Sequence, residues 1–396
     1  MEPDTSSRRP ADMTERAEKG LLPAGLQDVL PPLAAHESAV VERLIACFQA
    51  QGYERVKPPL LEFEEALLTG AGAAVASQTF RLMDPVSQRM MGLRADMTPQ
   101  VARIATTRLK KAPRPLRLCY GGQVLQVRGS QLRPERQFAQ AGIELIGAPQ
   151  ETADAEAVLL AIEALTAIGV PELSVDLNTP PLVGALAGEL GLAVPQVAEL
   201  RLALDRKDAA AVRELAGKHD PLFQALLRTA GPADKALSAL AALDLPPAAA
   251  AELARLAEVA ALVRDAAPQA RLTVDPVEHR GFEYQTGISF ILFARGVRGE
   301  LGRGGRYEAS GPNGERESST GFTLYLDSVL RALPPPAPAQ RIFLPFGTAS
   351  DEGRRLRAEG WTTVAGLAAV PDPQKEARRL GCSHCLADGA IAETKD

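Results

Sequence analysis

The sequence predicts an α+β protein, in which strands of an antiparallel sheet alternate with amphipathic helices. Runs of strand character at residues 116–120, 123–128 and 137–145 follow one another between polar turns, as neighbouring antiparallel strands do. Residues 180–267 are rich in alanine and leucine, which predicts an inserted helical subdomain. Beyond the stiff proline-rich linker at residues 334–338, alternating strand and helix patterns predict a small α/β module.

The bulk composition limits the class of protein. A length of 396 residues fits two or three domains, and a hydrophobic fraction of 46% is ordinary for a globular chain. No apolar run reaches the roughly 18–20 residues that span a bilayer. Four scattered cysteines favour a reducing compartment, so we expect a cytoplasmic protein. The net charge of −5 gives no general attraction for nucleic acid.

The N-terminal segment predicts an arm, a helix and a short strand. Residues 1–20 are polar and charged without an apolar period, and we expect a disordered arm. Residues 34–51 carry an apolar stripe with helical spacing, and Gly52 is suited to end that helix. Residues 53–56 then predict a strand, which the following prolines stop.

The next elements follow from the same kinds of pattern. A helix is expected over residues 98–109, with Thr98 as its cap and Pro99 at its first position. Further helices are expected at 153–168, 352–359 and 374–380, and further strands at 90–93, 173–177, 272–274, 288–293, 322–325, 341–346 and 362–364.

Five motifs, in a fixed order, place polar side chains along the sheet-rich region. The motifs are Arg94-Ala95-Asp96-Met97-Thr98, residues 125–144, residues 279–287, Gly304-Gly305-Arg306-Tyr307-Glu308 and residues 321–328. In this order they resemble the catalytic domain of histidyl-tRNA synthetase over residues 21–330. The resemblance implies a class II synthetase-like fold, with an antiparallel sheet flanked by helices, and a homodimer formed near residues 53–60.

The resemblance implies that the amino-acid side of that active site is largely kept. Asp96 and Thr98 match the residues that hold the α-ammonium group of the amino acid in the family. Gln140 and Glu144, which share one face of a strand, match the residues that hold the ammonium and the imidazole.

The carboxylate end of the same pocket falls on a later motif. Arg280 matches the arginine that reaches the ligand carboxylate, a role suited to its planar fork. Tyr284 is retained, whereas Gln285 replaces the family's second tyrosine. We therefore expect a histidine-like pocket.

The ATP side is altered at its cationic positions. Gln126 stands where the family has the arginine of its second motif, and Arg128 stands where the family has a carboxylate. Ser328 replaces the arginine that grips the γ-phosphate, and Tyr325 replaces a glycine beside it. Because phosphoryl chemistry relies on fixed positive charge, we expect these changes to abolish adenylation. A shifted phosphate contact from Arg128, with Arg133 and Arg136 also nearby, stays open as an alternative.

A second resemblance is more specific. The run from Arg94 to Gln100, followed by Val101-Ala102-Arg103-Ile104-Ala105, is similar to the regulatory subunit of ATP phosphoribosyltransferase. That family implies a chain without catalysis or a cofactor. It also implies a hetero-octamer of four regulatory and four short-form catalytic subunits, with feedback inhibition by histidine.

These resemblances give the expected domain plan. Residues 21–332 form the synthetase-like domain, with its helical insertion at about 180–267, and residues 339–396 form the C-terminal module. Because this module is shorter than the synthetase's anticodon-binding domain and the net charge is acidic, we do not expect tRNA as a partner.

Several alternatives remain open from sequence. The chain could be an active histidyl-tRNA synthetase with divergent ATP motifs, or an amino-acid sensor for another partner. Histidine could bind this chain, the partner or their junction. Cys382 and Cys385 have the spacing of a metal or redox pair, but no second pair completes a zinc site, so we expect no metal. The glycine-rich run 302–306 is expected to be a turn behind the pocket, although its backbone could cradle an anion.

Overall fold

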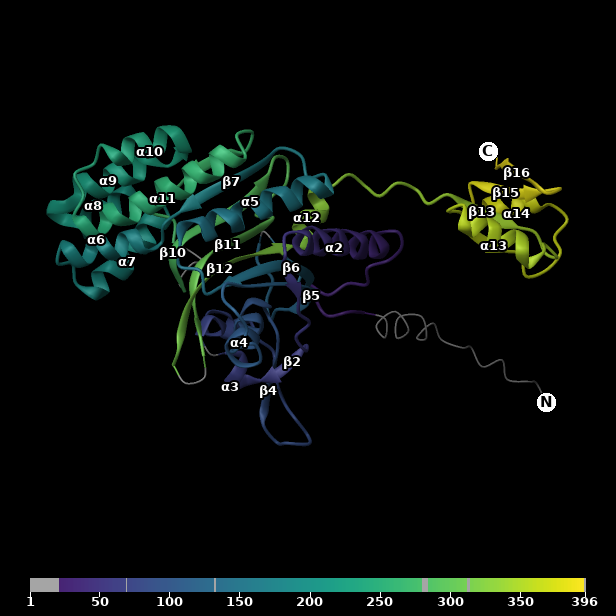
Figure 1. Ribbon diagram of the computed structural model, residues 1–396, viewed down its shortest axis with the longest axis horizontal. Coiled ribbons are helices and arrows are strands. Elements are labelled where there is room, and N and C mark those ends of the chain that lie inside the picture. The colour runs from purple at the N-terminus through teal and green to yellow at the C-terminus, as the bar shows by residue number, and fades with distance from the viewer. Residues whose placement is uncertain (1–20, 69, 132, 280–283, 312–313, 395–396) are drawn as a thin grey trace, which may run out of the picture. The chain divides into compact units, whose positions relative to one another are not determined.

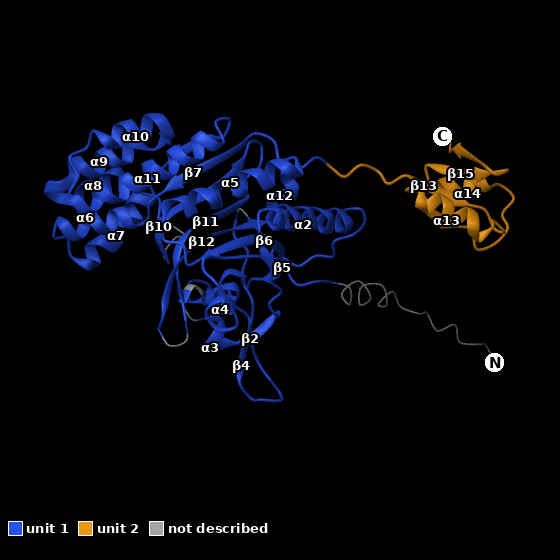
Figure 2. Cartoon of the chain, in the orientation of Figure 1, with its two compact units in different colours: residues 1–334 blue, residues 335–396 orange. Residues whose placement is uncertain are grey.

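The chain forms two compact units, which Figure 2 colours separately. The first ends at Pro334 and the second begins at Pro335. The expected arm and Arg280 lie outside the described residues. This computed structural model describes residues 21–68, 70–131, 133–279, 284–311 and 314–394 (Figure 1).

A nine-stranded sheet is the centre of the first unit, in the order β1-β5-β6-β12-β11-β10-β7-β9-β8. Its strands pair antiparallel except for β1 with β5 and β7 with β9, which are parallel. The strands are β1 (Glu54–Arg55), β5 (Leu116–Leu125), β6 (Gln137–Ile146), β7 (Leu173–Asn178), β8 (Gly231–Pro232), β9 (Arg271–Val274), β10 (Gln285–Ala294), β11 (Gly302–Ser310) and β12 (Arg316–Tyr325).

Helices cover this sheet and form the insertion between β7 and β9 (Figure 1). The long helices α2, α5 and α11 pack together on the sheet, while α4 contacts β6 and β11. The α-helices of this unit are α2 (Leu33–Ala50), α3 (Glu64–Leu67), α4 (Thr98–Thr107), α5 (Glu151–Ile168), α6 (Pro181–Glu189), α7 (Val194–Asp205), α8 (Ala209–Ala216), α9 (Asp220–Thr229), α10 (Ala233–Ala241), α11 (Pro247–Ala266) and α12 (Leu326–Ala332). Two 3₁₀ segments, η1 (Gly70–Gln78) and η2 (Gly217–His219), join them.

The two faces of the sheet have separate cores, because side chains alternate along each strand. On β6, Ile143 belongs to the core that includes the buried faces of α2, α5 and α11. On the same strand, Phe138 belongs to the core that α4 covers with Met97 and Val101. The second face also carries the even-numbered polar residues of β6, so polar side chains collect between α4 and the sheet.

A small antiparallel sheet lies beside this region, in the order β2-β4-β3. Its strands are β2 (Leu61–Phe63), β3 (Arg81–Met83) and β4 (Met90–Leu93). Arg94, directly after β4, donates hydrogen bonds to the carbonyl oxygens of Pro58 (3.0 Å) and Gln123 (2.7 Å). The guanidinium group therefore joins the small sheet to the end of β5 and fixes the entry to α4.

The second unit is a four-stranded sheet with two helices. Its order is β14-β13-β15-β16, and β13 is parallel to both of its neighbours. The elements are β13 (Arg341–Leu344), α13 (Ser350–Ala358), β14 (Thr362–Ala365), α14 (Pro373–Arg379), β15 (His384–Ala387) and β16 (Ala390–Glu393). The last two strands were not predicted from sequence.

Three details correct the sequence predictions. The prediction that Thr98 caps α4 is wrong: Met97 holds the cap position, and no side chain caps the helix. The predicted break within residues 116–128 is also wrong, because β5 continues to Leu125 and then ends. Gln126 and Arg128 therefore lie in the β5–β6 loop and not on a strand face.

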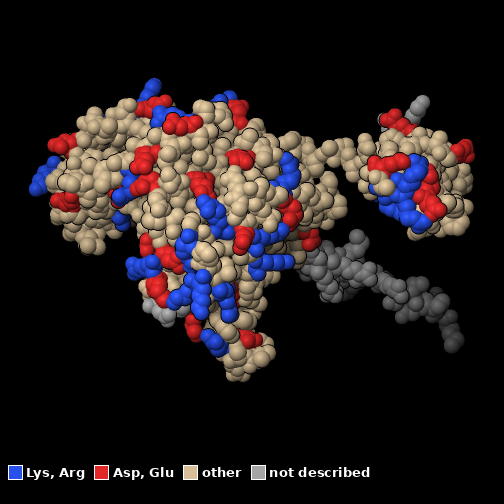
Figure 3. All heavy atoms as spheres, viewed as in Figure 1, with Lys and Arg blue, Asp and Glu red and all other residues tan. Residues whose placement is uncertain are grey.

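Positive and negative side chains are interspersed on the face shown in Figure 3, and one group of basic residues lies around α4 and the small sheet. Several of these basic residues are paired with carboxylates, as Arg103 is with Glu62 and Arg114 with Glu317 (2.6 Å). Among the described residues, none of the helices is long and apolar enough to cross a membrane.

The arginine of the Gly-Gly-Arg-Tyr motif has a structural role. Arg306 on β11 is 9% exposed and pairs with Asp154 of α5, which is 3% exposed, at 3.0 Å. It also donates hydrogen bonds to the carbonyl oxygens of Ala148 and Gln150, both at 2.8 Å. One buried guanidinium thus ties β11 to the start of α5.

Replacing Arg306 with leucine leaves the Asp154 carboxylate buried without its cation. We expect the free energy of unfolding to fall by about 3–5 kcal/mol, as it does when one partner of a buried ion pair is removed. Urea unfolding followed by circular dichroism measures the change. The control Arg55→Leu breaks an exposed pair with Glu42 and should cost about 0–1 kcal/mol. Equal losses in the two variants would contradict the structural role of Arg306.

Candidate functional site

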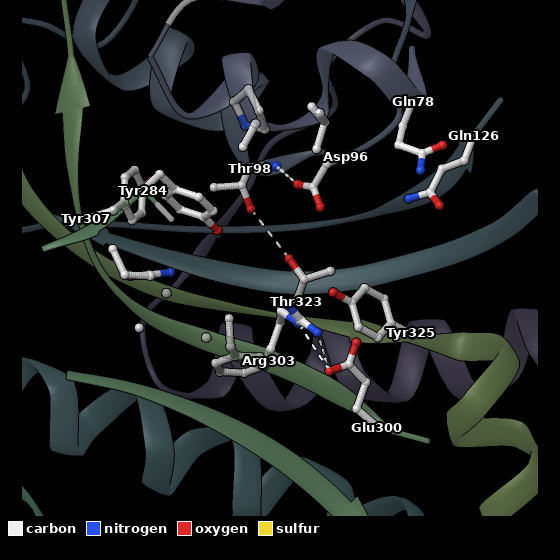
Figure 4. A pocket seen from close by; sticks show the side chains of 18 of the residues that line it. Gln78, Asp96, Thr98, Gln126, Tyr284, Glu300, Arg303, Tyr307, Thr323 and Tyr325 are labelled. Carbon is white, nitrogen blue, oxygen red and sulfur yellow. Dashed lines mark hydrogen bonds and ion pairs between the residues drawn. The ribbon is translucent and has the colours of Figure 1, made fainter. Parts of the chain in front are cut away.

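A cavity of about 470 Å³ opens between α4, the β5–β6 loop and the polar face of the sheet (Figure 4). Asp96 and Thr98 line it from the start of α4, and Glu144 lines it from β6. Tyr284 and Tyr307 close one end of the cavity. The first and second motifs of the sequence analysis thus meet here, together with parts of the later ones.

Pairing between β6 and β12 creates the space that Glu144 occupies. Glu144 lies opposite Gly321, and a Cβ atom on Gly321 would stand 2.3 Å from the Glu144 carboxylate. Gly142 does the same for Tyr120, whose hydroxyl would be 2.6 Å from a Cβ atom there. The two glycines allow a carboxylate and a phenol to lie inside the sheet layer.

Glu144 is held in a buried cage of hydroxyl groups. The Tyr307 hydroxyl donates a hydrogen bond to Oε2 at 2.9 Å, and the Tyr120 hydroxyl lies 3.4 Å from Oε1. Glu144 is 1% exposed, and burial raises its pKa to about 8. Burial therefore favours the protonated form of this side chain at neutral pH.

A chain of hydroxyls continues from this carboxyl group across the cavity wall. Tyr120 and Thr323 lie 2.7 Å apart, oxygen to oxygen, and the Thr98 hydroxyl is 3.2 Å from that of Tyr120. Thr323 on β12 was not predicted as a site residue. The Thr98 side chain does not cap α4 and instead points into this network, as Figure 4 shows.

Asp96 is oriented by its neighbours. Its Oδ1 atom accepts a hydrogen bond from the Thr98 backbone N–H (2.8 Å), and its Oδ2 atom accepts one from the Gln140 amide (3.2 Å). The Gln140 carbonyl oxygen accepts a bond from the Met97 backbone N–H (3.1 Å). Gln140 is fully buried and is not among the described residues that line the cavity. In this structure it positions the Asp96 loop.

Two tyrosine rings lie at the aromatic end of the cavity. Tyr284 packs edge to face on Tyr307, with ring centroids 5.9 Å apart, and Gln285 also lines the cavity. The expected carboxylate contact, Arg280, lies outside the described residues. Tyr307 lies in one of the five motifs of the sequence analysis. The motif does not reveal its contact with Glu144, because that contact depends on the pairing of β11 with β12 and of β12 with β6.

The three altered ATP positions are spread along the other end of the site. The Gln126 side chain lines the cavity and donates to the Ala95 carbonyl oxygen (3.3 Å). Arg128 lines it too, is exposed, and donates its backbone N–H to Gln78 (3.3 Å). Ser328 is buried in the first turn of α12, accepts a bond from Arg331 (2.9 Å) and is not among the described lining residues.

A cluster of charged residues lies on this side, and the sequence indicated only Arg133 of it, as a nearby cation. Arg133 stacks on Tyr325, with its guanidinium carbon 3.7 Å from the ring centroid. Glu300 and Arg303 lie beside Tyr325 and form a two-pronged ion pair, at 2.6 and 3.1 Å (Figure 4). Arg303 belongs to the glycine-rich run expected to be a turn; that prediction is wrong, because residues 302–306 are part of β11.

Metal chemistry has no candidate in the described part of the chain, where no group of three or more His, Cys, Asp or Glu side chains is arranged to hold an ion. Cys382 and Cys385 lie in one small apolar cluster of the second unit. Burial raises the pKa of both thiols. Such thiols are poor nucleophiles and poor metal ligands at neutral pH.

Comparison with known proteins places this geometry in context. A family model described as histidyl-tRNA synthetase matches residues 25–329. A histidyl-tRNA synthetase structure from a Nostoc species superposes with a TM-score of 0.79 at 19% identity, over 94% of this chain and 92% of that one. At this identity the match shows the fold, and the expected class II synthetase fold is confirmed.

Closer relatives carry a different name. ATP phosphoribosyltransferase regulatory subunits from Paramagnetospirillum magneticum and Rhodospirillum centenum are 57% and 58% identical to this chain. The matches cover 97% and 95% of this chain, and 100% and 97% of those proteins. A crystal structure of an ATP phosphoribosyltransferase regulatory subunit/histidyl-tRNA synthetase from Bacillus halodurans superposes with a TM-score of 0.79 at 25% identity, over 91% of this chain and 96% of the other. The chain therefore belongs to the ATP phosphoribosyltransferase regulatory subunit family, whose members share the histidyl-tRNA synthetase fold.

Proposed function

We propose that this chain is a non-catalytic regulatory subunit of ATP phosphoribosyltransferase. In this role it activates a short-form catalytic subunit and takes part in feedback control by histidine, in the first step of histidine biosynthesis. The observation that carries the proposal is the near full-length match to proteins of that name, at 57–58% identity. The proposal includes a cytoplasmic hetero-octamer of four regulatory and four catalytic subunits, built on a homodimer of this chain, without tRNA as a partner.

The geometry of the ATP side supports the absence of catalysis. Adenylation needs positive charge aimed at the phosphates of ATP. At the three family positions, Gln126 and Ser328 are uncharged, and the exposed Arg128 is the one cation. A synthetase-like pocket with this lining can hold an amino acid but lacks the family's means of activating it.

The geometry of the amino-acid side supports a histidine pocket. Asp96, oriented by two hydrogen bonds, offers a carboxylate to an ammonium group. Glu144 stands deeper, at the position that faces the imidazole in the family. A protonated carboxyl group can donate a hydrogen bond or accept one, so it can pair with the nitrogen of a neutral imidazole that faces it in either tautomer.

Activation of a catalytic partner tests the main proposal. Mixing the purified chain with a short-form ATP phosphoribosyltransferase should raise the rate of phosphoribosyl-ATP formation by roughly 5- to 150-fold, the usual range of allosteric coupling. Added histidine should lower that rate. The chain alone should give no histidine-dependent exchange of pyrophosphate into ATP. Such exchange, without activation, would instead support the alternative of an active histidyl-tRNA synthetase.

The histidine pocket is tested by calorimetric titration of the isolated chain. We expect Glu144→Leu to weaken histidine binding by about 5- to 150-fold, since an imidazole nitrogen left without its hydrogen-bond partner costs about 1–3 kcal/mol. Arg280→Ala should weaken it similarly if this arginine holds the carboxylate. The control Glu156→Gln alters a carboxylate of α5 that pairs with Arg117 away from the cavity, and should leave the affinity unchanged. Unchanged affinity in both pocket variants would remove the assignment.

The raised pKa of Glu144 also predicts how stability changes with pH. The folded chain keeps this proton up to about pH 8, whereas an unfolded glutamate releases it near pH 4.3. Between these values the folded state binds more protons, so the free energy of unfolding falls as pH rises, by at most about 1.4 kcal/mol per unit. Urea unfolding from pH 5.5 to 8 should show a shallower decline for Glu144→Gln than for the wild type. The pKa of Glu156 is lowered by its hydrogen bond from Arg117, so Glu156→Gln should run parallel to the wild type.

A further inference from the structure

The phosphate side of the cavity is lined by residues that are ion-paired within the chain itself. Arg133, in the β5–β6 loop, is 16% exposed and lies over the Tyr325 ring. Its Nε atom is 3.3 Å from Asp327 Oδ2, and its Nη2 atom is 3.6 Å from Glu300 Oε1. A cation that could meet a phosphate is thus already placed between two carboxylates.

These contacts belong to a longer network of alternating charge. Glu300 also pairs with Arg303 at 2.6 Å, and Asp327 also lies 3.5 Å from Arg331. Each carboxylate therefore lies between two guanidinium groups. Burial raises the pKa of Asp327, and the charges of Arg133 and Arg331 oppose that rise. The buried carboxylate thus depends on its arginines, which favours a fixed geometry.

The backbone holds Arg133 in this position. Its N–H donates to the Ser130 hydroxyl (2.9 Å), and its carbonyl oxygen accepts from the Ser130 N–H (2.6 Å). Gly129 permits this turn, because a Cβ atom there would stand 2.3 Å from the Pro134 carbonyl oxygen. Farther along, the Arg136 N–H donates to the Gly25 carbonyl oxygen (2.8 Å). The loop is therefore fastened at both sides of Arg133.

We propose that Glu300 and Asp327 act as built-in anions that hold Arg133 on Tyr325 and close the phosphate side, so that the cavity takes a free amino acid and rejects nucleotides. This inference rests on the proposed function, which defines that side of the cavity. Tyr325 and Asp327 stand in the motif that contacts ATP in the related synthetases. The network gives a physical cause for exclusion beyond the loss of the two family arginines, because a triphosphate would have to displace carboxylates from Arg133.

The test neutralises the two anions and measures binding of magnesium ATP by equilibrium dialysis at low ionic strength. The double variant Glu300→Gln/Asp327→Asn releases Arg133, and we expect its affinity for ATP to exceed that of the wild type by at least about tenfold. Adding Arg133→Ala should abolish the gain. Glu315→Gln/Glu317→Gln is the matched control, because it removes the same charge from β12 and the turn before it, at residues that do not line the cavity.

Three outcomes would overturn the proposal: saturable ATP binding by the wild type as strong as that of the double variant, no gain in the double variant, or a gain that persists without Arg133. Melting temperatures verify folding. If the double variant does not fold, the single variant Glu300→Gln takes its place in the test. It leaves the Asp327–Arg331 pair intact and should show a smaller gain in ATP affinity. Histidine titration of the wild type is read separately, because its failure contradicts the proposed histidine pocket and leaves the ATP comparison standing.

Discussion

The pairing of β6 with β12 is the constraint on which the site depends. Its register sets Glu144 opposite Gly321 and Gln140 opposite Tyr325. A one-residue slip would turn every polar residue of β6 into the apolar core on the other face. The glycine opposite Glu144 is equally restrictive, since any side chain there would occupy the space of the carboxylate. Pocket chemistry and sheet register are therefore fixed together.

Strand β12 contributes to both halves of the cavity, one lined by uncharged hydroxyl groups and the other by ion pairs. Thr323 joins the hydroxyl network around a protonated Glu144, which leaves hydrogen-bonding capacity for a ligand. Two residues later, Tyr325 carries the guanidinium of Arg133, whose charge faces Glu300 and Asp327. One half of the cavity offers hydrogen-bonding groups to a ligand, and the other already holds internal ion pairs. This contrast explains how a synthetase fold can keep an amino-acid pocket without phosphoryl chemistry.

Local patterns predicted most of the helices and strands, because their signals lie within a few residues. Helix α2 follows from its apolar stripe, and the proline in the first turn of α4 was expected. Pairing across the sheet overrode local signals elsewhere. The glycine-rich run of β11 resembles a turn, yet its glycines serve close approach: a Cβ atom on Gly304 would stand 2.4 Å from the Gly321 carbonyl oxygen. Two glycines in β5 did not break the strand, because β6 pairs along its whole length.

The site residues likewise include some that local motifs predict and others that only the folded sheet brings together. Asp96, Thr98 and Glu144 were predicted from motifs and do line one cavity. The charged network could not be predicted, because the β5–β6 loop, the turn before β11 and the start of α12 meet only after the sheet has formed.

The charge balance across that network affects which ligand the cavity favours. The three arginines Arg133, Arg303 and Arg331 face three carboxylates, Glu300, Asp327 and Glu135, so they add little net field to the cavity. Among the described residues that line the amino-acid end, the carboxylate of Asp96 then acts on a ligand without an arginine pairing it, and it favours an ammonium group over a phosphate. The exposed Arg128 lies at the other end of the cavity.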